Sequence, residues 1–111
     1  MANKSLGVIT ITAGTPQRLT ANESDSTAPV FAHSYMVEAW GATVSDGYVG
    51  TSALNTTSGA GVYGRIPRST ASQYFYFQAT CAKIHDLFDL SSVYLDGGNS
   101  GDKFLVSLIE A

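Results

Sequence analysis

Short apolar runs separated by turn residues extend along the whole chain, and this pattern limits the fold more than any other feature. The runs are about four to eight residues long, are rich in β-branched and aromatic side chains, and recur at intervals of roughly 8–15 residues. Clusters of Gly, Ser, Asn and Asp lie between them. About seven or eight short strands at this spacing predict an all-β fold, either an antiparallel β-sandwich or a jelly-roll-like barrel. The clearest runs are Val8–Thr12, His33–Trp40, Val62–Ile66, Gln73–Thr80 and Phe104–Ile109.

Two connections are expected to join strands that pair with each other. Asp46-Gly47 lies between two strand-like runs, a combination typical of a β-hairpin. The glycine-rich segment 96–102 separates Val93–Leu95 from Phe104–Ile109, and these two runs are expected to form the final strand pair. Both connections predict neighbours within one sheet.

The length of 111 residues predicts a single β-sandwich domain, residues 1–111, with residues 1–6 as a flexible N-terminal arm. Ile84, Leu87 and Phe88 follow a helical spacing, so one short helical turn is expected near 82–88. No apolar run approaches the roughly 20 residues that a membrane span requires. We therefore expect no membrane partner.

Charged residues make up only 14% of the chain, and Ser, Thr and Gly take their place. The formal net charge is −3 and the six basic residues are scattered, which argues against nucleic-acid binding. Cys81 is the only cysteine, so neither an internal disulfide nor a cysteine-based zinc site is expected. Its place beside an aromatic strand is typical of a small buried hydrophobic residue.

Two apparent ligand motifs are better explained as loops. Residues 59–64 spell G-x-G-x-x-G, but a polar loop precedes them and Pro67 follows too closely for a helix. Asp96, Asn99 and Asp102 offer oxygen ligands without the spacing of an EF-hand. We interpret them as a turn and leave ion binding open.

No catalytic, cofactor-binding or metal-binding residue is assigned, and the chain is expected not to be an enzyme. One catalytic alternative is a hydrolase in which His85 acts with Asp86 or Asp89. The competing interpretation places these side chains on a solvated turn. His33, inside a strand-like run, is expected to be a half-buried structural residue.

The aromatic strand Gln73–Thr80 is apolar on both faces. Tyr74 and Tyr76 alternate with Phe75 and Phe77, so tyrosines cover one face and phenylalanines the other. Either the tyrosines meet water while the phenylalanines enter the core, or the tyrosine face meets another protein. A second strand also has a Met and a Trp on one face. The candidate protein-interface residues are Met36, Trp40, Tyr74 and Tyr76.

Both ends of the chain resemble small virion proteins of tailed bacteriophages. Residues 2–20, which read ANKSLGVITITAGTPQRLT, are similar to the opening of such proteins. Residues 89–107 are similar to their ending, in which an Asp-Leu-x-x-hydrophobic-Tyr-hydrophobic-Asp segment precedes a Gly/Asp/Asn turn and a last strand. The resemblance covers roughly 40 residues, in segments that supply scaffold rather than functional residues.

The resemblance implies a capsid decoration or cement protein. It would be a homotrimer that binds the major capsid protein on the virion surface after synthesis in the bacterial cytoplasm, with no cofactor. Two alternatives stay open: a carbohydrate- or receptor-binding β-sandwich of a phage tail or fibre, and another head or tail structural component.

Overall fold

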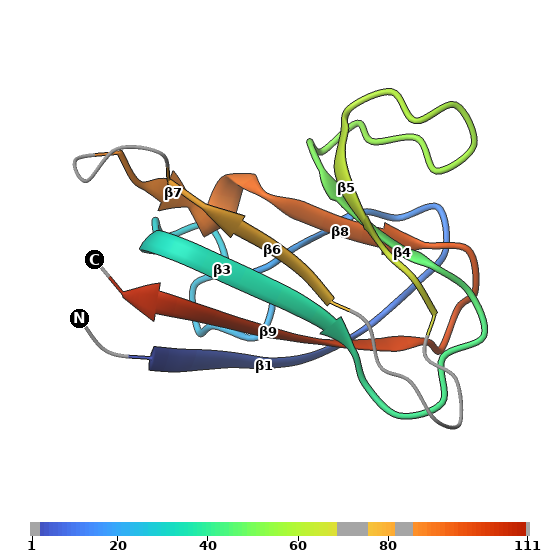
Figure 1. Ribbon diagram of the computed structural model, residues 1–111, viewed down its shortest axis with the longest axis horizontal. Coiled ribbons are helices and arrows are strands. Elements are labelled where there is room, and N and C mark those ends of the chain that lie inside the picture. Colours follow the sequence, from blue (N-terminus) through green and yellow to red (C-terminus); the bar gives the residue numbers. More distant parts are fainter. Residues whose placement is uncertain (1–2, 69–75, 82–85, 111) are drawn as a thin grey trace.

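The computed structural model describes residues 3–68, 76–81 and 86–110, which form two antiparallel β-sheets packed face to face (Figure 1). This confirms the predicted sandwich, and the sheets do not close into a barrel. The elements are β1 (Asn3–Thr10), β2 (Gln17–Arg18), β3 (Phe31–Ala39), β4 (Gly47–Gly50), β5 (Val62–Ile66), β6 (Tyr76–Thr80), β7 (Phe88–Asp89), the 3-10 turn η1 (Leu90–Ser92), β8 (Tyr94–Gly97) and β9 (Lys103–Glu110).

The larger sheet has five strands in the order β1-β9-β3-β6, with β7 also paired to β3. The smaller sheet has the order β2-β8-β4-β5. Strands from the two ends of the chain therefore lie side by side, since β1 pairs with β9 along its length (Figure 1). The strand β9 is central, because it pairs with β1 on one side and with β3 on the other.

Alternation along the strands builds the core. In β9, Phe104, Val106 and Leu108 are buried, and they lie beside Tyr35 and Val37 of β3. Each fully buried side chain of this size contributes roughly 1.5–3 kcal/mol through removal of apolar surface from water. The intervening residues of both strands face away from the smaller sheet.

The hairpin predicted at Asp46-Gly47 is wrong, because β3 and β4 belong to opposite sheets. The glycine has a packing role instead. A Cβ on Gly47 would lie 2.7 Å from two carbons of the Phe104 ring, so only glycine lets the two sheets approach here. The Asp46 carboxylate accepts a hydrogen bond from the Arg68 backbone N–H at 2.9 Å. Asp46 and Gly47 thus lie where the chain passes from the larger sheet to the smaller one, not in a hairpin.

The final strand pair is also wrong, since β8 lies in the smaller sheet and β9 in the larger one. The turn between them is fixed to a different loop. Both Asp102 carboxylate oxygens accept backbone N–H groups, one from Val44 at 3.1 Å and one from Ser45 at 3.0 Å. These bonds hold the turn where the chain passes from one sheet to the other.

Two further expectations need correction. Residues 3–6 are not a flexible arm, because they belong to β1 and pair with β9. Within the predicted helical turn at 82–88, residues 82–85 lie outside the described residues, 86–87 are irregular and 88–89 form β7. The 3-10 turn comes directly afterwards at η1. Its N-cap is Asp89, whose Oδ1 accepts from the Ser91 backbone N–H at 3.0 Å.

The short strands β2 and β7 were not expected, because two-residue strands have no recognisable alternation. In the part of the chain that the structure describes, no helix has the length and apolar character to cross a membrane.

Candidate functional site

The larger sheet has one face that points away from the core, called here the outer face. The Cα register places its side chains in rows across the strands. Among the described residues, Glu38 and Lys103 are its only charged side chains. Depletion of charge together with exposed aromatic residues is typical of the centre of a protein–protein interface. The outer face comprises Asn3, Ser5, Val8 and Thr10 of β1, Lys103, Leu105, Ser107 and Ile109 of β9, Ser34, Met36 and Glu38 of β3 with the following Trp40, and Tyr76, Gln78 and Thr80 of β6.

One end of the outer face has large side chains and is called the large half. Tyr76 of β6 and Leu105 of β9 lie on either side of Glu38 in the cross-strand register. Trp40 lies one step further along, where its backbone N–H donates to the Lys103 carbonyl at 2.9 Å. Trp40 and Tyr76 are 50% and 58% exposed, so two aromatic rings project into solvent. The large half is Val8, Trp40, Tyr76 and Leu105.

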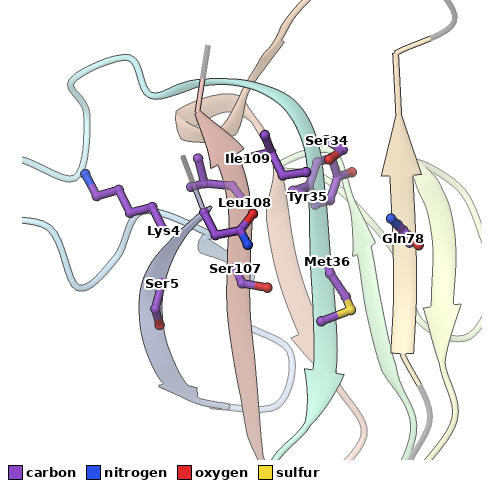
Figure 2. Close-up of a pocket in the computed structure, with 10 residues that line it drawn as sticks. Lys4, Ser5, Ser34, Tyr35, Met36, Gln78, Ser107, Leu108 and Ile109 are labelled. Atoms are coloured by element: carbon purple, nitrogen blue, oxygen red, sulfur yellow. The ribbon is translucent and has the colours of Figure 1, made fainter. Parts of the chain in front are cut away.

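At the other end of the outer face the side chains project less far from the sheet, and this end is called the hollow half. Ser5, Ser107, Met36 and Gln78 form one row across β1, β9, β3 and β6 (Figure 2). Because serine side chains are short, they leave a shallow hollow of about 420 Å³ over the sheet. Three residues of the next row, Asn3, Ile109 and Ser34, also line it. The hollow half is Ser5, Ser34, Met36, Gln78, Ser107 and Ile109.

The structure brings three of the four predicted interface residues to the outer face. Met36 is partly buried, and Trp40 and Tyr76 are exposed. Tyr74 lies outside the described residues. The predicted division of the aromatic strand holds where it is described, because Phe77 packs inward with its ring centroid 6.0 Å from that of Tyr35.

Sequence reasoning missed the contribution of β9 to the outer face. Leu105 and Ile109 are outward-facing, and they lie between the β1 and β3 residues of the same rows. The segment Phe104–Ile109 is apolar at every position except Ser107. A strand that is apolar on both faces is typical of burial on both sides. That pattern could have identified β9 as part of an interface.

The edge of the larger sheet at β1 is covered by the chain itself. The Asn22 side-chain amide donates to the carbonyl oxygens of Leu6 at 3.3 Å and Val8 at 2.8 Å. The Lys4 ammonium lies 3.5 Å from the Glu23 carboxylate in the same loop. The two Asn22 hydrogen bonds occupy backbone carbonyls that would otherwise pair with another strand. A partner is therefore better accommodated on the outer face than along this edge.

The two turn carboxylates have structural partners. Asp96, which is 3% exposed, accepts backbone N–H groups from Gly14 at 3.1 Å and Gly97 at 2.8 Å. Asp102 holds the loop at Val44 and Ser45, as described above. Among the described residues, no three His, Cys, Asp or Glu side chains gather as a metal site would require. These contacts favour the interpretation of this segment as a turn.

The other motifs also have local explanations. Gly59 and Gly61 have positive φ angles of 79° and 73° in the loop before β5, and Gly64 lies inside that strand. The G-x-G-x-x-G segment thus leads into a strand rather than a helix. His85 lies outside the described residues, Asp86 is exposed and Asp89 caps η1. His33 is half-buried as expected, and Cys81 is only partly buried.

Two further hollows flank the smaller sheet, and neither is lined by Trp40 or Tyr76. One of them contains Tyr94, whose ring is covered by the chain's own cation. The Arg18 guanidinium carbon lies 5.3 Å from the centre of the Tyr94 ring, and its Nε donates to the Ser91 carbonyl at 3.1 Å. This ring face is not open for a sugar to stack on. Trp40 and Tyr76 lie instead on the broad outer face of the larger sheet.

Comparison of the chain with protein-family models, with curated proteins and with solved structures found no match.

Proposed function

We propose that this protein is a non-enzymatic virion structural protein that binds the surface of a phage capsid and stabilises it as a decoration or cement protein. It acts as a homo-oligomer. The observation that carries the proposal is the outer face, where, among the described residues, aromatic and aliphatic side chains are exposed around one acid and one base. This surface suits contact with protein rather than with nucleic acid or a small molecule.

The chemistry of the outer face suits tight packing. Trp and Tyr provide large contact areas with few rotatable bonds, and they are frequent among residues that dominate binding. The hydroxyl side chains of Ser5, Ser34 and Ser107 lose little conformational entropy when covered. Each rotamer-rich side chain ordered at an interface costs about 0.5–1.5 kcal/mol, and this face has few of them.

The resemblance at the two ends of the chain supplies the biological setting. It supports a virion location, the major capsid protein as partner and a homo-oligomer as the assembled form. Residues 3–20 and 89–107 contribute β1, β2, η1, β8 and much of β9, so the resembling segments build adjacent strands of both sheets. They form the scaffold that presents the outer face.

A carbohydrate-binding role has less support. It would favour aromatic rings that line an open groove, whereas Trp40 and Tyr76 line none of the three hollows described. Tyr94, which does line one, is covered by Arg18. A glycan array would detect binding if a sugar were the ligand.

The test is to examine virions from the phage that encodes this chain. Mass spectrometry should find the protein in purified particles, and electron cryomicroscopy should show its density repeated over the capsid lattice. Particles that lack it should lose their DNA at lower temperature than complete ones. Absence of the chain from purified virions would contradict the proposal.

A binding assay links this function to the outer face. Shells assembled from the major capsid protein should co-sediment with the wild-type chain. Trp40→Ala should weaken binding by about 1–3 kcal/mol, which is roughly 5- to 150-fold, because chains that no longer associate with one another bind the shell singly. Tyr63→Ala is the matched control, because Tyr63 is 59% exposed on β5 of the other sheet. Equal weakening by both variants would show that binding to the shell does not depend on the outer face.

A further inference from the structure

We propose that the outer face binds a second copy of this chain as a two-fold pair, in which the large half of each copy packs on the hollow half of the other. The inference rests on the proposed function, because it names the contact between copies of the homo-oligomer proposed there and leaves the capsid to another surface of the chain. A two-fold pair needs a surface that is complementary to itself. Shape, size and charge of the outer face each meet this requirement.

Shape is the first argument. A two-fold axis that lies between the copies and runs across the strands, near Met36 and Glu38, reverses the strand direction and keeps each strand over its own counterpart. Trp40 of one copy then lies over Ser34 and Met36 of the other, which line the hollow (Figure 2). The same operation places large side chains over small or flexible ones in the neighbouring strands.

The cross-strand register carries this match over the whole face. Leu105 lies level with Glu38 and Ser107 level with Met36, so the axis brings Leu105 over Ser107. On β6, Tyr76 is level with Glu38 and Gln78 with Met36, so the same axis brings Tyr76 over Gln78. These projecting side chains thus meet lower positions, the axis also brings Lys103 over Ile109, and every such contact occurs twice. A two-fold axis parallel to the strands would instead place the large half on the large half and leave both hollows empty.

The available area sets the strength of the pair. Four strands spaced about 4.8 Å apart and about seven residues long give a face of roughly 500 Å². A pair would bury on the order of 1,000 Å², the lower limit for a specific interface. One copy would contribute about a twelfth of its total accessible surface of 6057 Å². We therefore expect a dissociation constant in the micromolar range rather than an obligate dimer.

Charge is compatible with self-association. The chain has a net charge of −3, but the outer face has one carboxylate and one ammonium group among its described residues. Two copies of this face therefore do not repel each other through net charge. Glu38 lies close to the axis, so the two Glu38 carboxylates are the like charges that approach each other most closely. Neutralising this side chain should tighten the pair.

Sedimentation equilibrium over a wide concentration range tests the pair. The wild-type mass should rise from 11.7 kDa towards twice that value. Trp40→Ser should weaken association at least tenfold, and Glu38→Gln should strengthen it several-fold. The control Tyr63→Ser changes an equally exposed ring on the other sheet and should leave association unchanged. A monomer at all concentrations, or equal effects of Trp40→Ser and Tyr63→Ser, would overturn the proposal.

Cross-linking tests the arrangement of the two copies in a Cys81→Ser background. Sheets pack about 10 Å apart, which is beyond disulfide reach, so a short bis-maleimide is the probe. A mixture of Trp40→Cys and Ser34→Cys chains should give mixed cross-linked pairs, because the axis places Trp40 of one copy over Ser34 of the other. Trp40→Cys alone should give none, because the two Trp40 positions lie about 20 Å apart along the strands. Cross-linking of Trp40→Cys chains with each other, without mixed pairs, would overturn the antiparallel pairing.

The outcomes separate this inference from the proposed function. A trimeric mass, with the chain present on virions, would overturn the two-fold pair and leave the virion role in place. A dimer with the expected cross-links, but with no chain on virions, would overturn the function and keep the pair.

Discussion

Asp102 is only 4% exposed. It lies between the turn that precedes β9 and the loop that follows β3. Its Oδ1 accepts from the Val44 backbone N–H and its Oδ2 from that of Ser45. The Asn99 side-chain amide lies 3.3 Å from Oδ1 as a third donor. Removal of this buried carboxylate leaves those donors without a partner.

We therefore predict that Asp102→Ala lowers the free energy of unfolding by about 1–3 kcal/mol. Urea denaturation followed by tryptophan fluorescence measures the change. Asp86→Ala is the matched control, because it removes the same charge from an exposed position and should change stability by less than about 0.5 kcal/mol. Similar midpoints for the two variants would show that the loop contacts of Asp102 contribute little.

Tyr35 allows a prediction of alkaline behaviour. Burial, with a smaller contribution from Tyr63, raises the pKa of Tyr35 from 10.0 to about 12. The unfolded chain therefore loses this proton before the folded chain does. The stabilisation is complete below pH 10 and is lost as the pH rises from about 10 to about 12. Tyr35→Phe should make the fall in stability over this window less steep, as measured by urea midpoints. An unchanged slope would contradict it.

At the scale of elements, close contact between β5 and β6 joins the edges of the two sheets. An added Cβ on Gly64 would overlap the ring of Phe77, so the absence of a side chain on β5 makes room for that ring. Phe77 also contacts Tyr35, whose ring in turn packs edge-on to Phe88 at 5.1 Å. The ring cannot shift without disturbing this cluster.

Gly64→Ala should accordingly destabilise the protein by about 1–3 kcal/mol through overpacking. Phe77→Leu should cost less than this, because Leu keeps much of the apolar contact. The double variant should be more stable than the sum of the two single effects predicts, since the smaller side chain leaves room for the methyl group. Additive effects would mean that the two residues do not contact each other in solution.

The element scale also shows what local patterns can predict. Alternation in His33–Trp40 correctly separated Tyr35, Val37 and Ala39, which are buried, from Met36 and Trp40. The turn residues at Asp46-Gly47 predict a hairpin, but the structure places β3 and β4 in different sheets. A turn residue reports only that the chain changes direction. Which strand lies beside which depends on contacts between residues far apart in the sequence.

At the scale of the whole molecule, self-association should appear as concentration-dependent stability. If two folded copies bind each other and unfolded chains do not, mass action raises the melting temperature. Above the dissociation constant, a tenfold increase in concentration should raise Tm by about 3 °C for a chain of this size. Scanning calorimetry of the wild type and Trp40→Ser checks this, with a constant Tm expected for the variant. Identical concentration dependence would exclude the outer face as the cause.

The sequence by itself determined the all-β fold class, the inward and outward sides of β3 and the placing of Met36, Trp40 and Tyr76 on outward positions. These follow from the two-residue period of a strand, which is a local property. Only the tertiary structure placed β9 between β1 and β3, and so joined Leu105 and Ile109 to those residues in one surface. Strand order is decided by burial of the whole core, to which residues from both ends of the chain contribute at once.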